Sequence, residues 1–125
     1  MFKIKDAAIH VTRSDVGAID VNMKDETGNI QMFKIGDVVR LNVMQKKRCD
    51  LVVLRKDVKI KNECEIVTLY LTSDDTSFCG PINKPTQFWY EIELNPETTP
   101  QTLIGYDEDG PKLFMVYPEG VKIDE

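Results

Sequence analysis

The sequence has few of the residues that bind metals or cross-link small proteins. It contains three cysteines, widely spaced at Cys49, Cys64 and Cys79 with no CxxC pair, and a single histidine, His10. A tetrahedral zinc site would need all four of these side chains in one place, whereas dedicated sites show close ligand spacings. We therefore expect buried or half-buried free thiols in a reducing compartment, with no metal ion and no cofactor.

Long apolar runs and extended basic runs are also absent. No stretch approaches the roughly 20 apolar residues that span a bilayer, and the opening MFKIKDAAIH has no signal-peptide core. The dense basic run Lys46-Lys47-Arg48 lacks interleaved aromatic residues, and a net charge of -5 repels a phosphate backbone. We expect no membrane attachment, no nucleic acid and no signal peptide.

The sequence also lacks the motifs that are typical of active sites. There is no Gly-rich phosphate loop, no nucleophile elbow and no serine with a plausible base. His10 alternates with Ile9 and Val11, a pattern that predicts a strand with His10 outward as a surface residue. The chain is therefore not expected to be an enzyme.

An acidic turn, Asp107-Glu108-Asp109-Gly110, separates two short apolar runs. It does not fit a calcium loop, because taking Gly110 as the sixth position puts Val116 where the twelfth-position glutamate belongs. Asp-Gly is a preferred hairpin dipeptide, since both residues accept positive φ. We expect Asp109 and Gly110 to turn a C-terminal β-hairpin formed by residues 101–106 and 112–117.

Period-two alternation recurs along the chain, whereas helical periodicity does not. With 42% hydrophobic and 30% charged residues, the composition is that of an ordinary globular protein, and 125 residues fit one domain, 1–125. Short strands with frequent turns are typical of an antiparallel, all-β sandwich or barrel. Strands are expected at 7–11, 16–23, 30–33, 38–44, 51–60, 63–71, 86–94, 101–106 and 112–117, and a helical turn at 74–79.

Several short polar stretches are expected to be structural turns. Gly36 tolerates positive φ, and Asp37 is expected to cap the turn before Val38. Asp75 and Thr76 lie in a break between two strong strands. Arg13 and Asp15 follow the first strand, where they are expected to form a local ion pair or an Asx-turn.

The candidate contact residues are apolar side chains on faces that should be polar. Trp89 alternates with Phe88 and Tyr90 and shares its face with glutamates, so it is either covered by a neighbouring strand or is an anchor for a partner. The C-terminal hairpin is apolar on both faces, so it is covered either by its own chain or by another subunit. Its candidate contact residues are Tyr106, Leu113, Met115 and Tyr117.

Five blocks in this order resemble the phage baseplate upper protein N-terminal domain and its prophage relatives. They are IHVTRSDVGAIDVNM, IGDVVRLNV, DDTSFCG, FWYEIEL and LIGYDEDGPKLFMVYPEG. The first block typically reads Thr-Arg-Gly-Asp in those relatives, so Ser14 departs from the usual glycine. Gly36-Asp37 and Asp75-Thr76 match the Gly-Asp and Asp-Thr positions of the family.

The resemblance implies an immunoglobulin-like β-sandwich that serves as a virion component, made in the bacterial host cytoplasm. It implies a non-catalytic tail or baseplate protein that contacts other tail or baseplate proteins and forms a homo-oligomer, a trimer or ring. In those proteins further domains usually follow, whereas this sequence stops at Glu125. The residues alone leave a second hypothesis open, a small carbohydrate- or ligand-binding module that uses Trp89 as a stacking platform.

Overall fold

The computed structural model describes residues 1–46 and 51–120, and its regular structure is almost entirely strand. Lys47, Arg48 and Cys49 lie outside the described residues. The strands are β1 (Phe2–Lys5), β2 (Ala8–Thr12), β3 (Gly17–Val21), β4 (Met23–Lys24), β5 (Ile30–Gln31), β6 (Val38–Met44), β7 (Val52–Lys59), β8 (Val67–Leu71), β9 (Thr86–Leu94), β10 (Gln101–Ile104) and β11 (Lys112–Tyr117). A short helix, α1 (Ser73–Thr76), precedes β9. The expected all-β class is confirmed.

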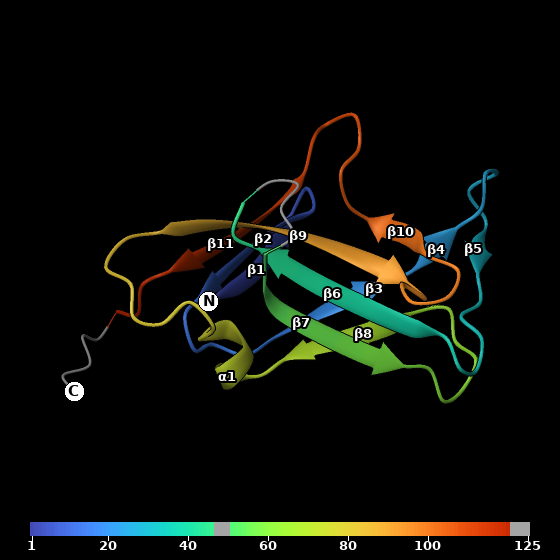
Figure 1. Ribbon diagram of the computed structural model, residues 1–125, viewed down its shortest axis with the longest axis horizontal. Helices are drawn as coiled ribbons and strands as arrows, with labels where there is room; N and C mark the ends of the chain where they lie inside the picture. The colour runs from blue at the N-terminus through green and yellow to red at the C-terminus, as the bar shows by residue number, and fades with distance from the viewer. Residues whose placement is uncertain (47–50, 121–125) are drawn as a thin grey trace.

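Seven strands form one large sheet in the order β1-β2-β11-β9-β6-β7, with β10 also paired to β9. The sheet is mixed, because β11 runs parallel to β2 while its other pairings are antiparallel. The expectation of a purely antiparallel architecture is therefore wrong at this one pair. The long β9, β6 and β7 lie side by side across the middle of Figure 1.

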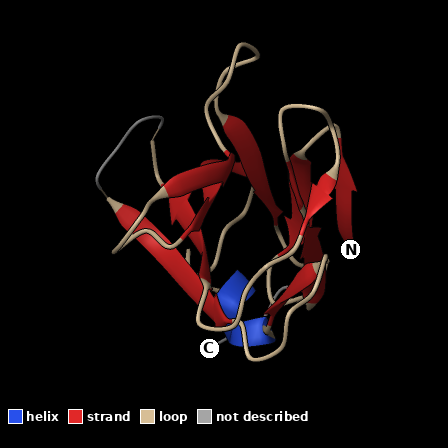
Figure 2. Ribbon diagram, turned by 90° about the vertical axis from the view of Figure 1, so that its right-hand side faces the viewer, coloured by secondary structure: helices blue, strands red, loops and turns tan. Residues whose placement is uncertain are grey.

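A two-stranded ribbon of β3 and β8 forms a second sheet, and β4 pairs with β5 in a third. Ile19 and Val21 of β3 and Leu69 and Leu71 of β8 belong to the same buried cluster as the inward side chains of the large sheet. The core therefore lies between the ribbon and the large sheet. Figure 2 shows the strands surrounding this core, with α1 at the lower end.

Strand β9 follows the period-two pattern throughout its length. Phe88, Tyr90, Ile92 and Leu94 are buried, while the intervening residues are half-buried or exposed. Because successive side chains of a strand point to opposite faces, this alternation assigns one face of β9 to the core and the other to the outside of the sheet. The expected strands at 38–44, 86–94 and 112–117 match β6, β9 and β11.

The predicted C-terminal hairpin is wrong in its pairing. Strands β10 and β11 do not pair with each other; both pair antiparallel with β9 along the same edge, at residues 92–94 and 86–90 respectively. They are therefore two parts of one interrupted strand, and residues 105–111 leave the sheet as an excursion. This excursion projects at the top of Figures 1 and 2, away from α1. The two segments that flank the turn could have paired with each other, but β9 is longer and provides one edge to which both can hydrogen-bond.

Other boundaries differ more modestly. Strand β1 was not expected, and residues 63–66 do not belong to β8, which begins at Val67. The expected run 16–23 is divided at Asn22 into β3 and β4. The expected helical turn is present as α1, shifted toward the N-terminus by a capping box in which Thr72 accepts from the backbone N–H of Asp75.

Replacing a core-facing side chain of β11 should be far more costly than replacing its outward neighbour. Phe114 is fully buried, so Phe114→Ala should lower the free energy of unfolding by about 3–5 kcal/mol. Leu113→Ala, one position earlier on the outward face, should cost about 1 kcal/mol. Urea unfolding at low protein concentration measures both. Equal losses would contradict the assignment of the two faces.

Tyr90 should make stability fall at alkaline pH. Burial raises the pKa of its phenol to about 12, and its hydroxyl donates to the carbonyl of Ala7 at 2.5 Å. Since the folded pKa lies above the unfolded value near 10, the stabilisation is complete below pH 10 and is lost as the pH rises toward 12. Tyr90→Phe should cost about 0.5–1.5 kcal/mol at pH 7. The unfolding free energy of Tyr90→Phe should decline less steeply than that of the parent between pH 10 and 12. The same slope in both proteins would contradict a raised pKa for Tyr90.

Candidate interaction surface

A row of apolar side chains crosses the outward face of the large sheet. Leu113 of β11 is directly opposite Trp89 of β9, Trp89 is opposite Met44 of β6, and Met44 is opposite Val52 of β7. Paired residues on neighbouring strands share a face, so the four side chains form one continuous row across four strands. All four are half-buried, and none belongs to the core cluster or to the side chains packed against it. We call this set the apolar row.

Met115 and Tyr117 extend the apolar row on one side. They follow Leu113 on the same face of β11, and they pair with His10 and Thr12 of β2. A hydrogen bond of 2.8 Å joins Nδ1 of His10 to the hydroxyl of Tyr117. His10 does point outward, but the expectation of a plain surface residue is wrong, because it is half-buried beside Tyr117. Four of the five predicted contact residues therefore lie on one face.

Polar side chains occupy the same face on the other side of the apolar row. Glu91 is opposite Asn42 and Asn42 is opposite Arg55, while the next outward residue of β9 is Glu93. Asn42 donates to Glu93 at 3.1 Å and accepts from Nε of Arg55 at 3.2 Å. Asn42 is buried, although it points outward, because these neighbours cover it. Burial, and then the adjacent Glu93, raise the pKa of Glu91.

An ion pair ends this polar region. Arg40 donates to both carboxylate oxygens of Asp57, at 2.7 and 3.0 Å, and reaches Glu97 at 3.5 Å. The two hydrogen bonds from the guanidinium lower the pKa of Asp57. The carboxylate of Asp57 is therefore neutralised locally, unlike those of Glu91 and Glu93.

The excursion carries the fifth predicted contact residue, Tyr106, which is 59% exposed and stands apart from the apolar row. Its tip is the expected tight turn: Asp107 and Gly110 exchange backbone hydrogen bonds, and Gly110 has a φ of 91°. The backbone N–H of Asp109 donates to the carboxylate of Asp107. Lys112 also donates to that carboxylate and lowers its pKa, so the charge of Asp107 is neutralised within the excursion.

Arg13 and Asp15 do not pair with each other, so the predicted local ion pair is wrong. Arg13 donates to Glu119 at 2.5 Å, and the carboxylate of Asp15 contacts the N-terminal ammonium of Met1. The turn between them is closed by the backbone, with the N–H of Asp15 donating to Thr12 at 3.0 Å. Ser14 has a φ of 72°, a left-handed conformation that favours glycine.

Gly36 and Asp37 lie in the turn that precedes β6. Asp37 accepts from the backbone N–H of Lys34 at 2.8 Å and from Asn95 at 3.0 Å, and Gly36 has a φ of 93°. Asp37 thus caps the turn before β6.

Asp75 and Thr76 belong to α1 rather than to an open turn. Asp75 completes the capping box and pairs with Lys56 at 2.8 Å. Thr76 is fully buried, and its hydroxyl donates to the carbonyl of Asp15 at 2.8 Å. This bond ties α1 to the turn that contains Ser14.

The structure describes two of the three cysteines. Cys64 and Cys79 are both half-buried and free, as expected. Burial raises the pKa of the Cys79 thiol, although nearby Arg13 acts in the opposite direction. Within residues 1–46 and 51–120, no group of three or more His, Cys, Asp or Glu side chains is placed to hold a metal ion. The helix in the described ranges is too short to cross a bilayer.

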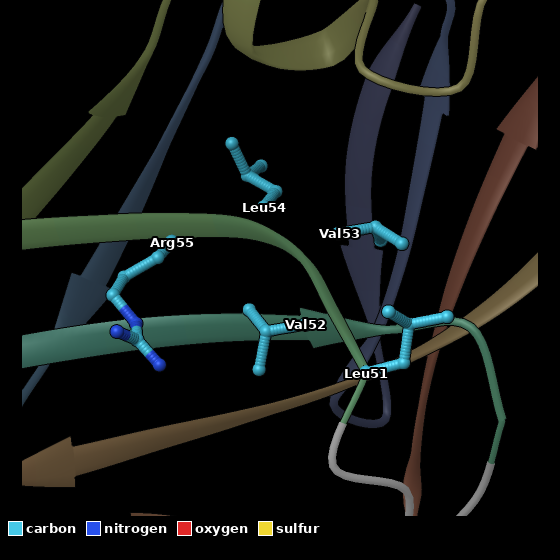
Figure 3. Close-up of a pocket in the computed structure, with 5 residues that line it drawn as sticks. All are labelled: Leu51, Val52, Val53, Leu54 and Arg55. Atoms are coloured by element: carbon cyan, nitrogen blue, oxygen red, sulfur yellow. The ribbon is translucent and has the colours of Figure 1, made fainter.

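A shallow hollow of about 380 Å³ lies beside the start of β7, lined by Leu51, Val52, Val53, Leu54 and Arg55 (Figure 3). The pairing of β6 and β7 is irregular here, and Figure 3 shows Val53 and Leu54 on one side of the strand, with Val52 and Arg55 on the other. None of the lining residues is aromatic, and they do not bring polar groups together. The hollow therefore lacks the stacking platform that a sugar site needs.

Two members of the apolar row, Met44 and Val52, were missed by sequence reasoning. Met44 ends the alternation of Val39, Leu41 and Val43 on the outward side, which was a usable signal. Val52 gave none, because the irregularity at Val53 puts Val52 out of step with the alternation of residues 54–59.

No protein-family model matches this chain, and no curated protein matches it. The resemblance to the baseplate family therefore rests on the five sequence blocks.

The bond from Thr76 to Asp15 should be a measurable link between α1 and the Ser14 turn. Thr76→Val keeps the shape of the side chain but leaves the Asp15 carbonyl without this donor, so it should cost about 1 kcal/mol. The matched control is Thr68→Val, which removes an exposed hydroxyl bonded to Asp20 and should stay within about 0.5 kcal/mol of the parent. Thermal unfolding compares them, and equal effects would contradict a special role for Thr76.

Proposed function

We propose that this chain is a non-catalytic structural protein of a phage or prophage tail or baseplate, acting through protein–protein contacts. The observation that carries the proposal is the apolar row with Met115 and Tyr117. A two-sheet protein buries one face of each sheet, whereas this sheet also has half-buried apolar side chains on its outward face. Apolar surface gathered in this way typically marks a protein contact.

We propose that the fold is immunoglobulin-like, and the strand arrangement supports this assignment. In such sandwiches strands C, F and G form one sheet, C′ extends it in variable-type domains, and B pairs with E in the other sheet. Here β6, β9 and β11 are adjacent, β7 flanks β6, and β3 pairs with β8. Taken in chain order, β3, β6, β7, β8, β9 and β11 correspond to B, C, C′, E, F and G.

The first family block gives independent support. Its relatives typically carry glycine at the position of Ser14, and Ser14 has the positive φ that glycine adopts readily. Its hydroxyl also contacts Ser77 at 2.7 Å, which ties the side chain to the segment after α1. The backbone at Ser14 has a conformation that favours glycine, and the family has glycine at this position. This agreement is consistent with a shared local structure.

In this proposal the protein is made in the bacterial host cytoplasm and becomes a virion component. Its partners are other tail or baseplate proteins and further copies of itself. No described residue carries out chemistry in this role; the outward face of the large sheet makes the contact.

Incorporation into particles tests the proposal. Peptides of this chain should be found by mass spectrometry in gradient-purified particles induced from the strain that encodes it. Met115→Asp should reduce incorporation at least tenfold without changing the unfolding temperature of the isolated protein, because a buried charge opposes the contact. The control is Tyr70→Asp on β8, where the side chain is 67% exposed and outside the apolar row; it should be incorporated normally.

A chain that is expressed but absent from purified particles would overturn the proposed function. Equal incorporation of Met115→Asp and the parent would show that the contact lies elsewhere on the molecule.

A further inference from the structure

Two carboxyl groups lie next to each other on the outward face of the central strand β9. Glu91 and Glu93 are two residues apart, so their side chains leave the same face of the strand. Both are half-buried, and their carboxyl groups are within hydrogen-bonding reach of each other. Neither forms an ion pair with any residue in the ranges 1–46 and 51–120. Two carboxylates this close repel each other, and a proton between them removes the repulsion.

Cations lie on the same part of the face, but they are engaged with other groups. The charged side chains there come from β6, β7 and the loop after β9: Arg40, Arg55, Asp57, Lys59 and Glu97. Arg40 is opposite Glu93, yet its guanidinium donates to both carboxylate oxygens of Asp57, at 2.7 and 3.0 Å. Arg55 donates to the side-chain carbonyl of Asn42 at 3.2 Å. Both guanidinium groups are therefore engaged away from the glutamate pair.

Neutral groups complete the surroundings of the pair. Asn42, which is buried and opposite Glu91, donates to the carboxylate of Glu93 at 3.1 Å. On the other edge of β9, Thr102 is opposite Glu93, and Gly105 lies beside the Cβ of Glu91. Burial, and then the charge of Glu93, raise the pKa of Glu91, although a hydrogen bond from Asn42 acts in the opposite direction.

We propose that Glu91 is protonated at mildly acidic pH and donates a hydrogen bond to the carboxylate of Glu93, which makes the pair a pH-sensitive element of the outward face. In this state the pair carries one negative charge, which Asn42 also stabilises. Loss of the proton leaves two adjacent carboxylates beside Trp89, on the same face of β9. Because covering a half-buried charge costs free energy, a contact on this face weakens as the pH rises. This coupling rests on the proposed function, whereas the shared proton does not.

A carboxyl titration of the isolated protein tests the shared proton. The side-chain carboxyl carbon of Glu91, followed by NMR, should titrate above the ordinary glutamate value of about 4.3. Glu93→Gln replaces the neighbouring charge by a neutral amide, so the midpoint for Glu91 should fall. The matched control, Glu108→Gln, removes an exposed carboxylate on the excursion and should leave that midpoint unchanged.

A Glu91 midpoint at or below about 4.3 would overturn the inference. A raised midpoint that Glu93→Gln does not lower would also overturn it, because burial alone would then account for the raised value.

The pH dependence of stability gives a second readout. Since the folded pKa of Glu91 lies above the unfolded value of about 4.3, stabilisation by its proton is complete below that pH and is lost as the pH rises through the folded pKa. Glu91→Gln is neutral at every pH and keeps a donor toward Glu93. The parent should therefore lose unfolding free energy relative to Glu91→Gln over this window, while Glu108→Gln follows the parent. Urea unfolding at a series of pH values measures this loss, and parallel curves for the parent and Glu91→Gln would refute the shared proton.

Release from purified particles tests the coupling to the contact. Particles that contain the parent should release a roughly twofold larger fraction of this chain at about pH 8 than at about pH 5.5, whereas Glu91→Gln should be released equally at both. Equal release of the parent at the two pH values would overturn the coupling. A chain that is absent from particles would refute the proposed function and the coupling together, whereas the carboxyl titration would still decide the shared proton.

Discussion

Strand β9 is hydrogen-bonded along both edges, and the rest of the structure depends on this pairing. Strand β6 occupies one edge, while β10 and β11 share the other. Its inward residues, Phe88, Tyr90, Ile92 and Leu94, form part of the core. Its outward residues, Trp89, Glu91 and Glu93, set the order of apolar and polar rows on the opposite face. One alternating strand therefore supplies the core and positions the candidate contact surface.

The sharing of one β9 edge by two strands also explains the excursion. Residues 105–111 leave the sheet between the partners of Ile92 and Tyr90, so their acidic turn projects beyond it. Asp107 is neutralised by Lys112, and Gly110 takes the positive φ that the turn requires. The carboxylate at the base of this turn is therefore neutralised by a cation from the start of β11.

Much of the local structure could be predicted. The alternation of Phe88, Tyr90, Ile92 and Leu94 defined β9, and the glycine at position 36 and the capping carboxylate of Asp37 defined a turn, because these features depend on neighbouring residues alone. The pairing of residues 101–106 with 112–117 was predicted wrongly. Two strands joined by a good turn sequence are compatible with a hairpin, but hydrogen bonding to the longer β9 satisfies more backbone groups.

The sequence by itself determined which residues alternate, where the chain turns and which side chains of β11 share a face, since a period of two leaves no freedom once the strand exists. Only the tertiary structure decided what lies beside them. Leu113, Trp89, Met44 and Val52 come from four strands, and their alignment depends on sheet order, register and the irregularity at Val53. The same applies to His10 and Tyr117, which are 107 residues apart in the sequence, because sheet pairing brings distant segments to one face.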